Sequence, residues 1–399
     1  MDKKFVDYTE VTEAEDTDVL LIHDGNGVKK ITKKNFLGNI HGGNSGISRW
    51  LRFNPLNKKG LIIKAGTSIK LSNGDYAYYE EDTQVNLSSQ LDTVGADYLL
   101  YINDDLTFTA SKTERNTGVK IGRFHTLCVD AGANLTMKAP AAPSSGLTAG
   151  DPYLVKPYRE DEDKDFHDFY NVTISGVTVQ SYYDLVTMAH PLAGFAVGDI
   201  LPESVFCNTF KPNTLFEDAM VYDKTTDKVI DVYLQSGMGH GTRSAYNQNH
   251  TVSRQAWNHM GDMLAVGKQL LSDHEFTSAA LGSNEATNIA GGADVTKVGG
   301  HTDSAGRRMI SAIGCEEMCG YLWQWLRDLP GNNGSTTWAA KDGNGSFGQE
   351  YFEDYVLIAG GHWNGAAYCG SRGRLSNSVR SVVGAYVGWR GSSQVIRCQ

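Results

Sequence analysis

The segment GGHWNGAAYCGSRGRLSNSVRSVVGAYVGWRG, residues 360–391, is the most informative part of this chain. It combines small residues, aromatic rings and single arginines without keeping one secondary-structure period. In an extended segment, alternate side chains point to opposite faces. The sequence therefore predicts a rigid extended segment that presents an assorted row of side chains to solvent, although an ordinary final strand explains the pattern equally well. The assorted row consists of His362, Asn364, Ala366 and Tyr368, and the packing row of Trp363, Gly365, Ala367 and Cys369.

The length and composition of the chain exclude several classes of protein. Its 399 residues predict two or three domains, and 40% hydrophobic with 21% charged residues is a globular balance. A net charge of −10 disfavours nucleic acid as the main partner. The polar start, MDKKFVDYTEVTEAEDTD, lacks the apolar core of a secretory signal, and no apolar run approaches the ~20 residues that span a bilayer. We expect synthesis in a cytoplasm and no membrane insertion.

Six cysteines are spread along the chain without a Cys-x-x-Cys pair. That is too sparse for a disulfide scaffold and lacks the spacing of a zinc site, so we expect reduced, buried thiols. No cofactor is predicted, and no set of metal ligands is assigned.

The first part of the chain is predicted to be β structure. Runs 19–23 and 28–32 flank the turn sequence DGNG and predict a hairpin within an N-terminal segment, residues 1–46. Residues 47–150 contain short alternating runs around turns at 72–75 and 103–105, which are typical of a β-sandwich or barrel. The stretch APAAPSSGLTAGDP, residues 139–152, is predicted to be a linker.

The remainder, residues 151–399, is predicted to be an α+β domain. Helical spacing is present over 253–271, where Ser253 is the expected N-cap, and over 314–329. Glycine-rich loops and short strands surround these two segments. The apolar stripe of the second expected helix consists of Met318, Tyr321, Leu322 and Trp325.

No residue pattern of a known catalytic site is present: there is no Walker loop, dinucleotide-binding glycine pattern, Gly-x-Ser-x-Gly elbow or zincin helix. Isolated His and Asp pairs at 259–262 and 301–303 are expected to be satisfied surface or loop residues. The acidic run 159–165 is expected to be a solvated loop. We expect the solvent-exposed face of a helix to carry Glu316 and Glu317. We expect the core to contain Trp323 and Trp325.

Three segments resemble the formylglycine-generating-enzyme fold, which is a variant of the C-type lectin fold. They are VGKQLLSDHEFTSAALG (266–282), YLWQWLRD (321–328) and VGWR (387–390). Enzymes of that family use a pair of nearby cysteines in the C-terminal region, whereas the stretch 360–391 has only Cys369. The resemblance therefore favours the fold and argues against the oxidase chemistry.

The order of the motifs resembles more closely the variable proteins of diversity-generating retroelements. GGHWNGAAYCGSR followed by VGWRG is similar to that family's variable region, here 360–391. Residues 198–237 and 121–128 resemble segments that lead into the lectin domain of similar phage proteins, and the start resembles the attachment segment of phage tail proteins. The resemblance implies a multidomain chain, with N-terminal all-β regions followed by an α+β C-type-lectin-like domain at 151–399.

In that family a template is copied with errors at adenines, so selected positions vary while the scaffold stays constant. The resemblance implies a fixed scaffold that includes Trp363, Gly370, Ser371, Arg372 and Arg390. Two of the implied variable positions, Leu375 and Val387, could equally be core. The implied ligand-binding positions are His362, Asn364, Ala366, Tyr368, Leu375, Asn377, Ser378, Val382, Gly384, Tyr386 and Val387.

The function that the resemblance implies is non-enzymatic binding of a host-cell surface receptor, protein or glycan, by a phage or prophage tail protein. It further implies attachment to other tail proteins through the N-terminus, a homotrimer, and location in the virion after synthesis in the bacterial cytoplasm. Two alternatives stay open. One is a structural tail protein without a receptor, and the other is an enzyme of the formylglycine-generating type.

Overall fold

The computed structural model describes residues 19–23, 28–32, 49–140, 185–289, 298–300, 308–328, 355–379 and 381–397. Over these residues the fold is mostly β with few helices. The first two strands, β1 (Val19–His23) and β2 (Val28–Thr32), pair antiparallel with Val19 opposite Thr32. The strands of the predicted N-terminal hairpin are therefore confirmed, and its turn lies outside the described residues.

The β-rich region consists of short antiparallel strands joined by tight turns. The predicted turn at 72–75 joins β5 to β6, and the one at 103–105 joins β8 to β9. Their asparagine and aspartate side chains accept hydrogen bonds from nearby backbone N–H groups, as at Asn73 and Asp105. The strands are β3 (Leu51–Phe53), β4 (Gly60–Ile63), β5 (Thr67–Lys70), β6 (Tyr76–Tyr79), β7 (Thr83–Asn86), β8 (Asp97–Ile102), β9 (Phe108–Ser111) and β10 (Val119–His125).

The middle of the chain adds short strands and two single-turn 3₁₀ helices, η1 (Pro202–Ser204) and η2 (Gly239–Gly241). The first two of these strands, β11 and β12, flank the undescribed residues 141–184 and pair with each other. The strands are β11 (Thr136–Pro140), β12 (Leu185–Ala189), β13 (Phe206–Cys207), β14 (Phe210–Pro212), β15 (Met220–Asp223), β16 (Lys228–Asp231), β17 (Gln235–Ser236) and β18 (Arg243–Ser244).

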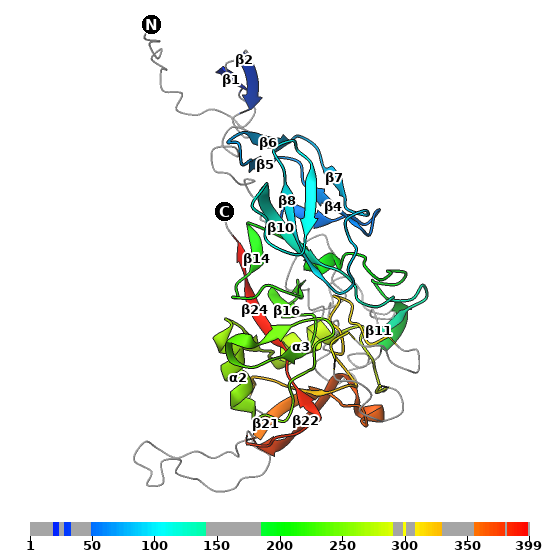
Figure 1. The fold of residues 1–399 in the computed structure, drawn as a ribbon. Helices are drawn as coiled ribbons and strands as arrows, with labels where there is room; N and C mark the ends of the chain where they lie inside the picture. The colour runs from blue at the N-terminus through cyan, green and yellow to red at the C-terminus, as the bar shows by residue number, and fades with distance from the viewer. Residues whose placement is uncertain are drawn as a thin grey trace, which may run out of the picture.

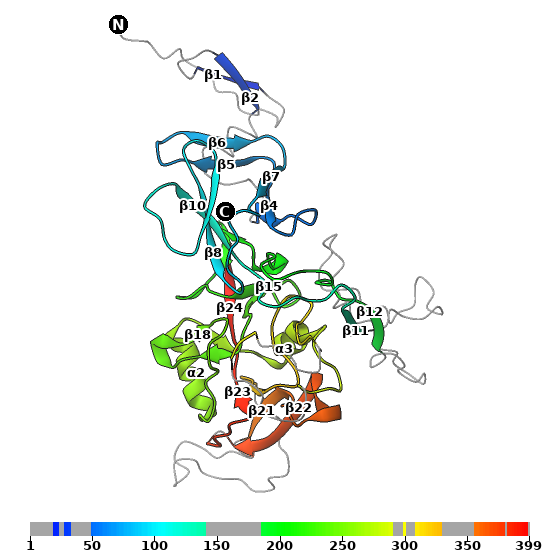
Figure 2. The same cartoon turned by 45° about the vertical axis from the view of Figure 1, so that its right-hand side comes forward.

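One large sheet joins the β-rich region to the last strand of the chain, β24 (Gly391–Arg397). Its order is β15-β16-β24-β14-β13-β10-β8-β9, and β19 (Gln269–Leu270) also pairs with β24. A single buried cluster likewise combines residues from Trp50 to Phe124 with residues from Ile200 to Val229. The two regions therefore share a sheet and a core (Figures 1 and 2). The predicted boundary near residue 150 falls outside the described residues and stays a prediction.

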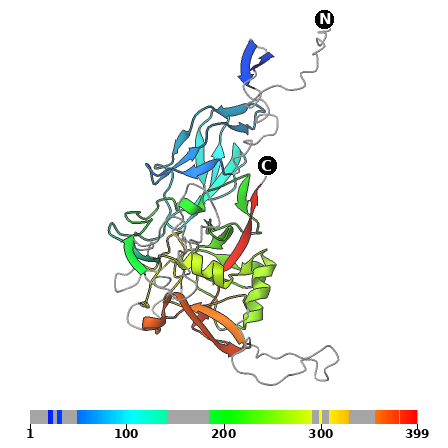
Figure 3. The ribbon, with the colours of Figure 1, turned by 180° about the vertical axis from the view of Figure 1, so that it is seen from behind.

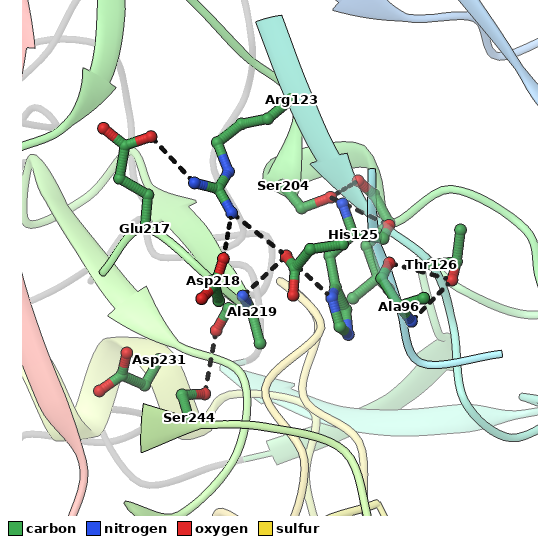
Figure 4. A network of polar contacts seen from close by, with 12 residues as sticks. Ala96, Arg123, His125, Thr126, Ser204, Glu217, Asp218, Ala219, Asp231 and Ser244 are labelled. Carbon is green, nitrogen blue, oxygen red and sulfur yellow. Dashed lines mark hydrogen bonds and ion pairs between the residues drawn. The ribbon is translucent and has the colours of Figure 1, made fainter. Parts of the chain in front are cut away.

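Polar side chains reinforce this junction (Figure 4). Arg123 on β10 binds Glu217 at 2.9 Å and Asp218 at 2.7 Å, just before β15. His125 bridges Asp97, 3.2 Å from its Nδ1, and the Tyr233 hydroxyl, 2.9 Å from its Nε2. Burial alone would raise the pKa of Asp97, but the neighbouring His125 and Arg123 lower it below its usual value. The contacts hold the end of β10 against the following region.

Two helices cover part of the second region. The helix predicted over 253–271 is present as the shorter α2 (Ala256–Ala265), because Gly267 has a φ of 75° and the chain continues as β19. The prediction of Ser253 as its N-cap was wrong. Gln255 occupies that position, and Ser253 itself has a φ of 58°. The next helix, α3 (Asp273–Ala280), begins with a capping box between Ser272 and Glu275.

The helix predicted over 314–329 is wrong. The segment contains a bridge at Glu316 and then β20 (Trp323–Trp325). Gly314, Glu317 and Gly320 have φ angles of 99°, 50° and 80°, which no helix accommodates. Because residues 314–326 are all buried, their apolar spacing does not mark one face of a helix. Glu316 and Glu317 are therefore buried rather than on a wet face, and the prediction of Trp323 and Trp325 as core residues is confirmed.

The closing segment builds a second, four-stranded sheet. Its order is β22-β21-β20-β23, formed by β21 (Tyr355–Gly360), β22 (Gly370–Val379) and β23 (Val387–Gly388) with β20. The β21–β22 hairpin lies at the opposite end of the molecule from β5 and β6 (Figures 1 and 3). Residues that connect these strands are thus carried at one tip of the fold.

Candidate functional site

Two connections of the four-stranded sheet form the candidate site, and we call their residues 362–368 and 381–386 the distal surface. The first is the turn between β21 and β22, and the second is the loop before β23. Both connections form backbone hydrogen bonds with the buried segment that contains Tyr321 and Trp323. The backbone N–H of Trp363 donates to the Tyr321 carbonyl, and that of Trp323 donates to the Tyr386 carbonyl, each at 3.0 Å.

The turn is not the extended strand that the alternation predicts. Residues 366–368 form a 3₁₀ turn, η4 (Ala366–Tyr368), and Ala366 has a φ of 45°. The packing row is confirmed only in part, because Gly365 and Cys369 are buried but Ala367 is exposed. Gly365 is buried against the Cys369 sulfur, where an added Cβ would lie 2.3 Å from it. The small packing residue is therefore required by a close approach rather than by a strand period.

Aromatic rings dominate the distal surface. The Trp323 ring lies 6.1 Å from the Tyr368 ring with 5° between their planes, and 6.2 Å from the His362 ring with 23° between them. His362 also lies 5.6 Å from the Tyr386 ring. Tyr368 is 55% exposed and Tyr386 38%, whereas Trp323 is 4% exposed. The partly exposed Tyr368 and the half-buried His362 therefore lie against a buried tryptophan, and Tyr386 lies against His362.

The structure places the predicted ligand-binding residues in three different environments. Among those of the turn, Asn364, Ala366 and Tyr368 are exposed and His362 is half-buried. In the loop, Tyr386 is exposed, Val382 is half-buried, and Gly384 is buried with its carbonyl accepting the Ser253 N–H at 3.1 Å. Asn377 and Ser378 belong to β22, and their side chains lie outside the described residues.

Two predicted positions belong to the core. The Val387 side chain is 2% exposed and packs with Trp325 and Trp389, so it does not reach a ligand in this conformation. Leu375 is half-buried against the same cluster. Of the two interpretations that the sequence left open, the structure favours core for both. The β-strand pairing of Val387 with Trp323 accounts for this, because it turns the valine under the surface.

Asn288 and Glu285 form hydrogen bonds with the turn and with the start of β22. Neither residue was predicted from the sequence. The Asn288 side-chain amide donates to the Trp363 carbonyl and its Oδ1 accepts the Ala366 N–H at 3.1 Å. The carboxylate of Glu285 accepts the Ser371 N–H at 3.2 Å and its hydroxyl at 2.5 Å. Burial raises the pKa of Glu285. The polar cluster SNEATN at 283–288 was the available signal.

Arg390 ties the closing segment to the core. It is 0% exposed, and its guanidinium donates to the carbonyls of Asp231 at 2.6 Å, Val232 at 2.5 Å and Glu316. Its Nε donates to Gln324 at 3.3 Å. The Asp231 carboxylate nearby also pairs with buried Lys268 at 2.5 Å. A buried charge held in this way supports the predicted scaffold role of Arg390.

The electrostatics of the distal surface are close to neutral. Residues 362–368 and 381–386 include no lysine, arginine, aspartate or glutamate. Burial lowers the pKa of His362, which favours its neutral form. Burial also raises the pKa of the Cys369 thiol to about 11, so this thiol is protonated at neutral pH and is a poor nucleophile.

The other candidate groups do not form a site within the described residues. There, no group of three or more His, Cys, Asp or Glu side chains is arranged to hold a metal ion. His259 contacts the Arg254 carbonyl at 3.1 Å, and Asp262 pairs with the Arg254 guanidinium at 2.9 Å. Asp262 is therefore satisfied as predicted, whereas the Nδ1 of His259 has no hydrogen-bond partner among the described residues, and both residues are buried on α2 rather than on a surface. The candidates at 159–165 and 301–303 lie outside the described residues.

The described cysteines are free and buried, as predicted, and none of the described helices is long and apolar enough to cross a membrane. No family model matches the chain. In sequence, it is 26% identical over 344 residues to the tail fiber receptor-binding protein of Bordetella phage BPP-1, covering 82% of this chain and 78% of that protein.

Solved structures give the same indication for the fold. The Major Tropism Determinant I1 variant superposes with a TM-score of 0.61 at 21% identity, covering 95% of this chain and 93% of that chain. The P3c variant has a TM-score of 0.59 at 22% identity with the same coverage. The chain is therefore similar in sequence to a phage tail fiber receptor-binding protein and has the C-type-lectin-like fold of the Major Tropism Determinant, which confirms the resemblance predicted from its closing segment.

Proposed function

We propose that this chain is a receptor-binding protein of a phage or prophage tail, and that the distal surface contacts the host receptor. The observation that carries the proposal is the uncharged, aromatic surface at one tip of the fold, held by buried contacts beneath it. Large aromatic rings supply contact area at low cost in side-chain entropy, and they dominate binding energy in protein interfaces. The sequence relative bears the name of a receptor-binding protein.

The second part of the proposal is that exposed positions of the distal surface vary while their supports stay constant. Asn364, Ala366 and Tyr368 are exposed, so exchanging them costs little folding energy, usually within ~0.5 kcal/mol each. The supporting residues Asn288, Glu285 and Arg390 bind the backbone of the segment or of its neighbours, and these bonds persist whatever side chain is displayed. Such a division suits a diversified binding surface.

The assembly of the protein follows from the same proposal. A chain that attaches through residues 1–46 and carries its binding surface at the far tip suits a tail fibre in the virion, made in the bacterial cytoplasm. A homotrimer would repeat the distal surface, and several copies on one virion would raise avidity by roughly 10²–10⁴ where the geometry permits. The division into an attachment segment, a β-rich domain at 47–150 and a C-type-lectin-like domain at 151–399 belongs to this proposal.

A non-enzymatic role is part of the proposal. The protonated, buried Cys369 thiol does not favour the alternative of formylglycine-type chemistry. For the structural alternative, in which the closing segment packs against a neighbouring tail protein, the exposed Asn364 and Tyr368 would have to be covered.

Binding to cells tests the proposal. Labelled full-length chain is incubated with a panel of bacterial strains, and bound label is measured by flow cytometry. Exchanges at His362, Asn364, Tyr368 and Tyr386 should change which strains bind, with the melting temperature preserved. Tyr76→Ala, in β6, is the matched control, because Tyr76 is 56% exposed and Tyr368 55%. Equal binding by all variants, or large losses of stability at these positions, would contradict the proposal.

Sequencing the DNA downstream of the gene tests the diversification. We expect a near-copy of the codons for residues 362–391 that differs mainly at adenines, beside a reverse-transcriptase gene. Its absence would leave the fold and the binding role in place and would make the distal surface a fixed one.

A further inference from the structure

Trp323 is held directly under the distal surface by its backbone. It begins β20, its N–H donates to the Tyr386 carbonyl at 3.0 Å, and it pairs in parallel with Val387. Two residues earlier, Tyr321 forms a bridge with His362. Both halves of the distal surface are therefore in register with this one tryptophan, whatever side chains they carry.

Two of the side chains that the proposed function treats as exchangeable, His362 and Tyr368, lie against the Trp323 ring. The Tyr368 ring lies nearly parallel to it, and the His362 ring lies beside both, 6.4 Å from Tyr368. The Tyr386 ring lies 5.6 Å from the His362 ring, with 59° between their planes. The indole is 4% exposed: it belongs to the buried cluster that includes Trp325 and Val387, and the Tyr368 and His362 rings lie against it as well. A smaller side chain at position 368 removes the ring that is stacked on the indole.

We infer that Trp323 is a fixed ligand-contacting residue, and that the side chains at 362, 368 and 386 determine how much of its indole face a ligand reaches. The inference rests on the proposed function and deepens it. Each variant of the surface would then combine the constant Trp323 indole with a different set of side chains around it. Trp and Tyr are the residues that most often supply the dominant energy of an interface when a partner group fills the pocket around them.

The chemistry around the indole selects an apolar or aromatic side chain of a protein receptor as the ligand group. Ala366, Val383 and Ala385 are exposed next to the rings in the chain, and no charged residue belongs to the distal surface. A sugar ring that stacks on an indole also needs several polar groups for its hydroxyls. The turn offers one exposed amide, that of Asn364, which favours the apolar ligand. Beside the rings, His362 Nδ1 is buried without a hydrogen-bond partner among the described residues, so a polar ligand atom pairs with it only where an exchange uncovers it.

Fluorine NMR tests the inference in the full-length chain. The seven tryptophans are replaced biosynthetically by 5-fluorotryptophan, and Trp323→Phe assigns the Trp323 resonance. The spectra of the unaltered chain, Tyr368→Ala and the matched control Tyr76→Ala are recorded in H₂O and D₂O. They are then repeated with N-acetyltyrosinamide as the aromatic probe and methyl α-glucopyranoside as the sugar probe. Tyr386→Ala is the second variant, for use if Tyr368→Ala lowers the folded fraction.

In Tyr368→Ala we expect the Trp323 resonance to gain a solvent isotope shift several-fold larger than in the unaltered chain, and to move with N-acetyltyrosinamide. Tyr76→Ala should leave it unchanged. A Trp323 resonance that stays insensitive to solvent in both tyrosine variants would overturn the inference, because the indole would then be core only. Movement with the sugar and not with the tyrosinamide would overturn the assigned ligand chemistry.

Cell binding separates this inference from the proposed function. Once a binding strain is found, Trp323→Phe should weaken binding about tenfold in several distal-surface variants. If cell binding is intact but insensitive to Trp323→Phe, only the inference fails. If no distal-surface exchange alters cell binding, the proposed function fails even where the indole becomes exposed in the spectra.

Discussion

Tyr386 and Arg390 belong to the same closing segment, yet they are in opposite environments. Tyr386 is 38% exposed, and its ring lies 5.6 Å from the His362 ring. Arg390 is 0% exposed and donates to three backbone carbonyls and Gln324. A few residues of chain thus pass from a surface that tolerates exchange to a framework that does not.

Buried residues such as Arg390 therefore contribute more to the free energy of folding than exposed ones such as Tyr386. When an exposed ring is removed, water takes its place and little folding free energy is lost. When a buried donor is removed, several buried acceptors are left without hydrogen-bond partners. The framework can therefore stay rigid while the surface changes. Four predictions test this contrast, ordered by the expected loss of folding free energy.

The largest loss is expected for Arg390→Ala. The substitution leaves the carbonyls of Asp231, Val232 and Glu316 buried without this donor and places a cavity beside the Asp231–Lys268 pair. We expect the free energy of unfolding to fall by about 3–5 kcal/mol, the range found when one member of a buried charged network is removed. Urea unfolding followed by circular dichroism measures it.

The control for that experiment is Arg52→Ala, because Arg52 is exposed on β3 and its Nε donates only to the nearby Arg49 carbonyl at 3.3 Å. Its loss should stay within ~0.5 kcal/mol. Similar losses for the two arginines would mean that the Arg390 contacts do not support the fold.

The second prediction compares a framework histidine with one of the distal surface. Burial, together with the Arg254 cation, lowers the pKa of His259 to about 3, from an ordinary 6.5. The unfolded chain therefore binds a proton between these values while the folded chain does not, so stability falls as the pH decreases from 6.5 toward 3. Acidification from pH 6.5 to 4.5 should remove roughly 2–3 kcal/mol through His259 alone.

The measurement is the difference in unfolding free energy between pH 6.5 and 4.5 for the unaltered chain and for His259→Gln. The variant should show a smaller pH dependence. His362→Gln should change the pH dependence much less, since that imidazole is only half-buried. A larger effect from His362 would reverse the assignment of framework and surface.

Asn288→Ala should give the third effect. The substitution removes the side-chain contacts to the Trp363 carbonyl and the Ala366 N–H, which are the bonds that set the turn from below. We expect a loss of about 1–2 kcal/mol and altered cell binding, although Asn288 itself lies under the distal surface. Asn288→Asp keeps the acceptor for Ala366 but points a carboxylate oxygen at the Trp363 and Ile289 carbonyls, so it should lose stability as well. Equal stability of all three chains would contradict the role of this side chain.

Parts of this contrast could be predicted from the sequence, and parts could not. The local signals sufficed for the β-hairpins, for the core of α2 and for the exposure of Asn364 and Tyr368. Helical spacing failed at 314–329 because that segment is buried on every side, so no face is marked by polar residues. Alternation predicted the exposure of Asn364 and Tyr368 correctly, but it was wrong for Ala367, which is exposed because residues 366–368 form a 3₁₀ turn rather than a strand.

Contacts between distant segments were the part that no local pattern contained. Asn288 lies 75 residues from its acceptor Trp363, and Arg390 lies 159 residues from Asp231. Trp323 was expected in the core and is there, but its place under the surface rings follows only from the strand register. The resemblance named Arg390 as scaffold, but it also counted the buried Gly384 and Val387 among the displayed positions. The supports Asn288 and Glu285 could be found only from the fold.

The smallest loss is expected for Tyr368→Ala, and Tyr98→Ala is the informative comparison. Both tyrosines have a ring stacked on another ring, at 6.1 Å from Trp323 and at 5.6 Å from Phe124. Tyr98 is 1% exposed and its hydroxyl bonds Asp92, so its removal should cost about 3–5 kcal/mol. Tyr368 is 55% exposed and should cost no more than about 0.5 kcal/mol. Thermal unfolding of both variants decides the matter. If Tyr368→Ala were as costly as Tyr98→Ala, the distal surface would belong to the folding core, and the freedom of position 368 to vary would be lost.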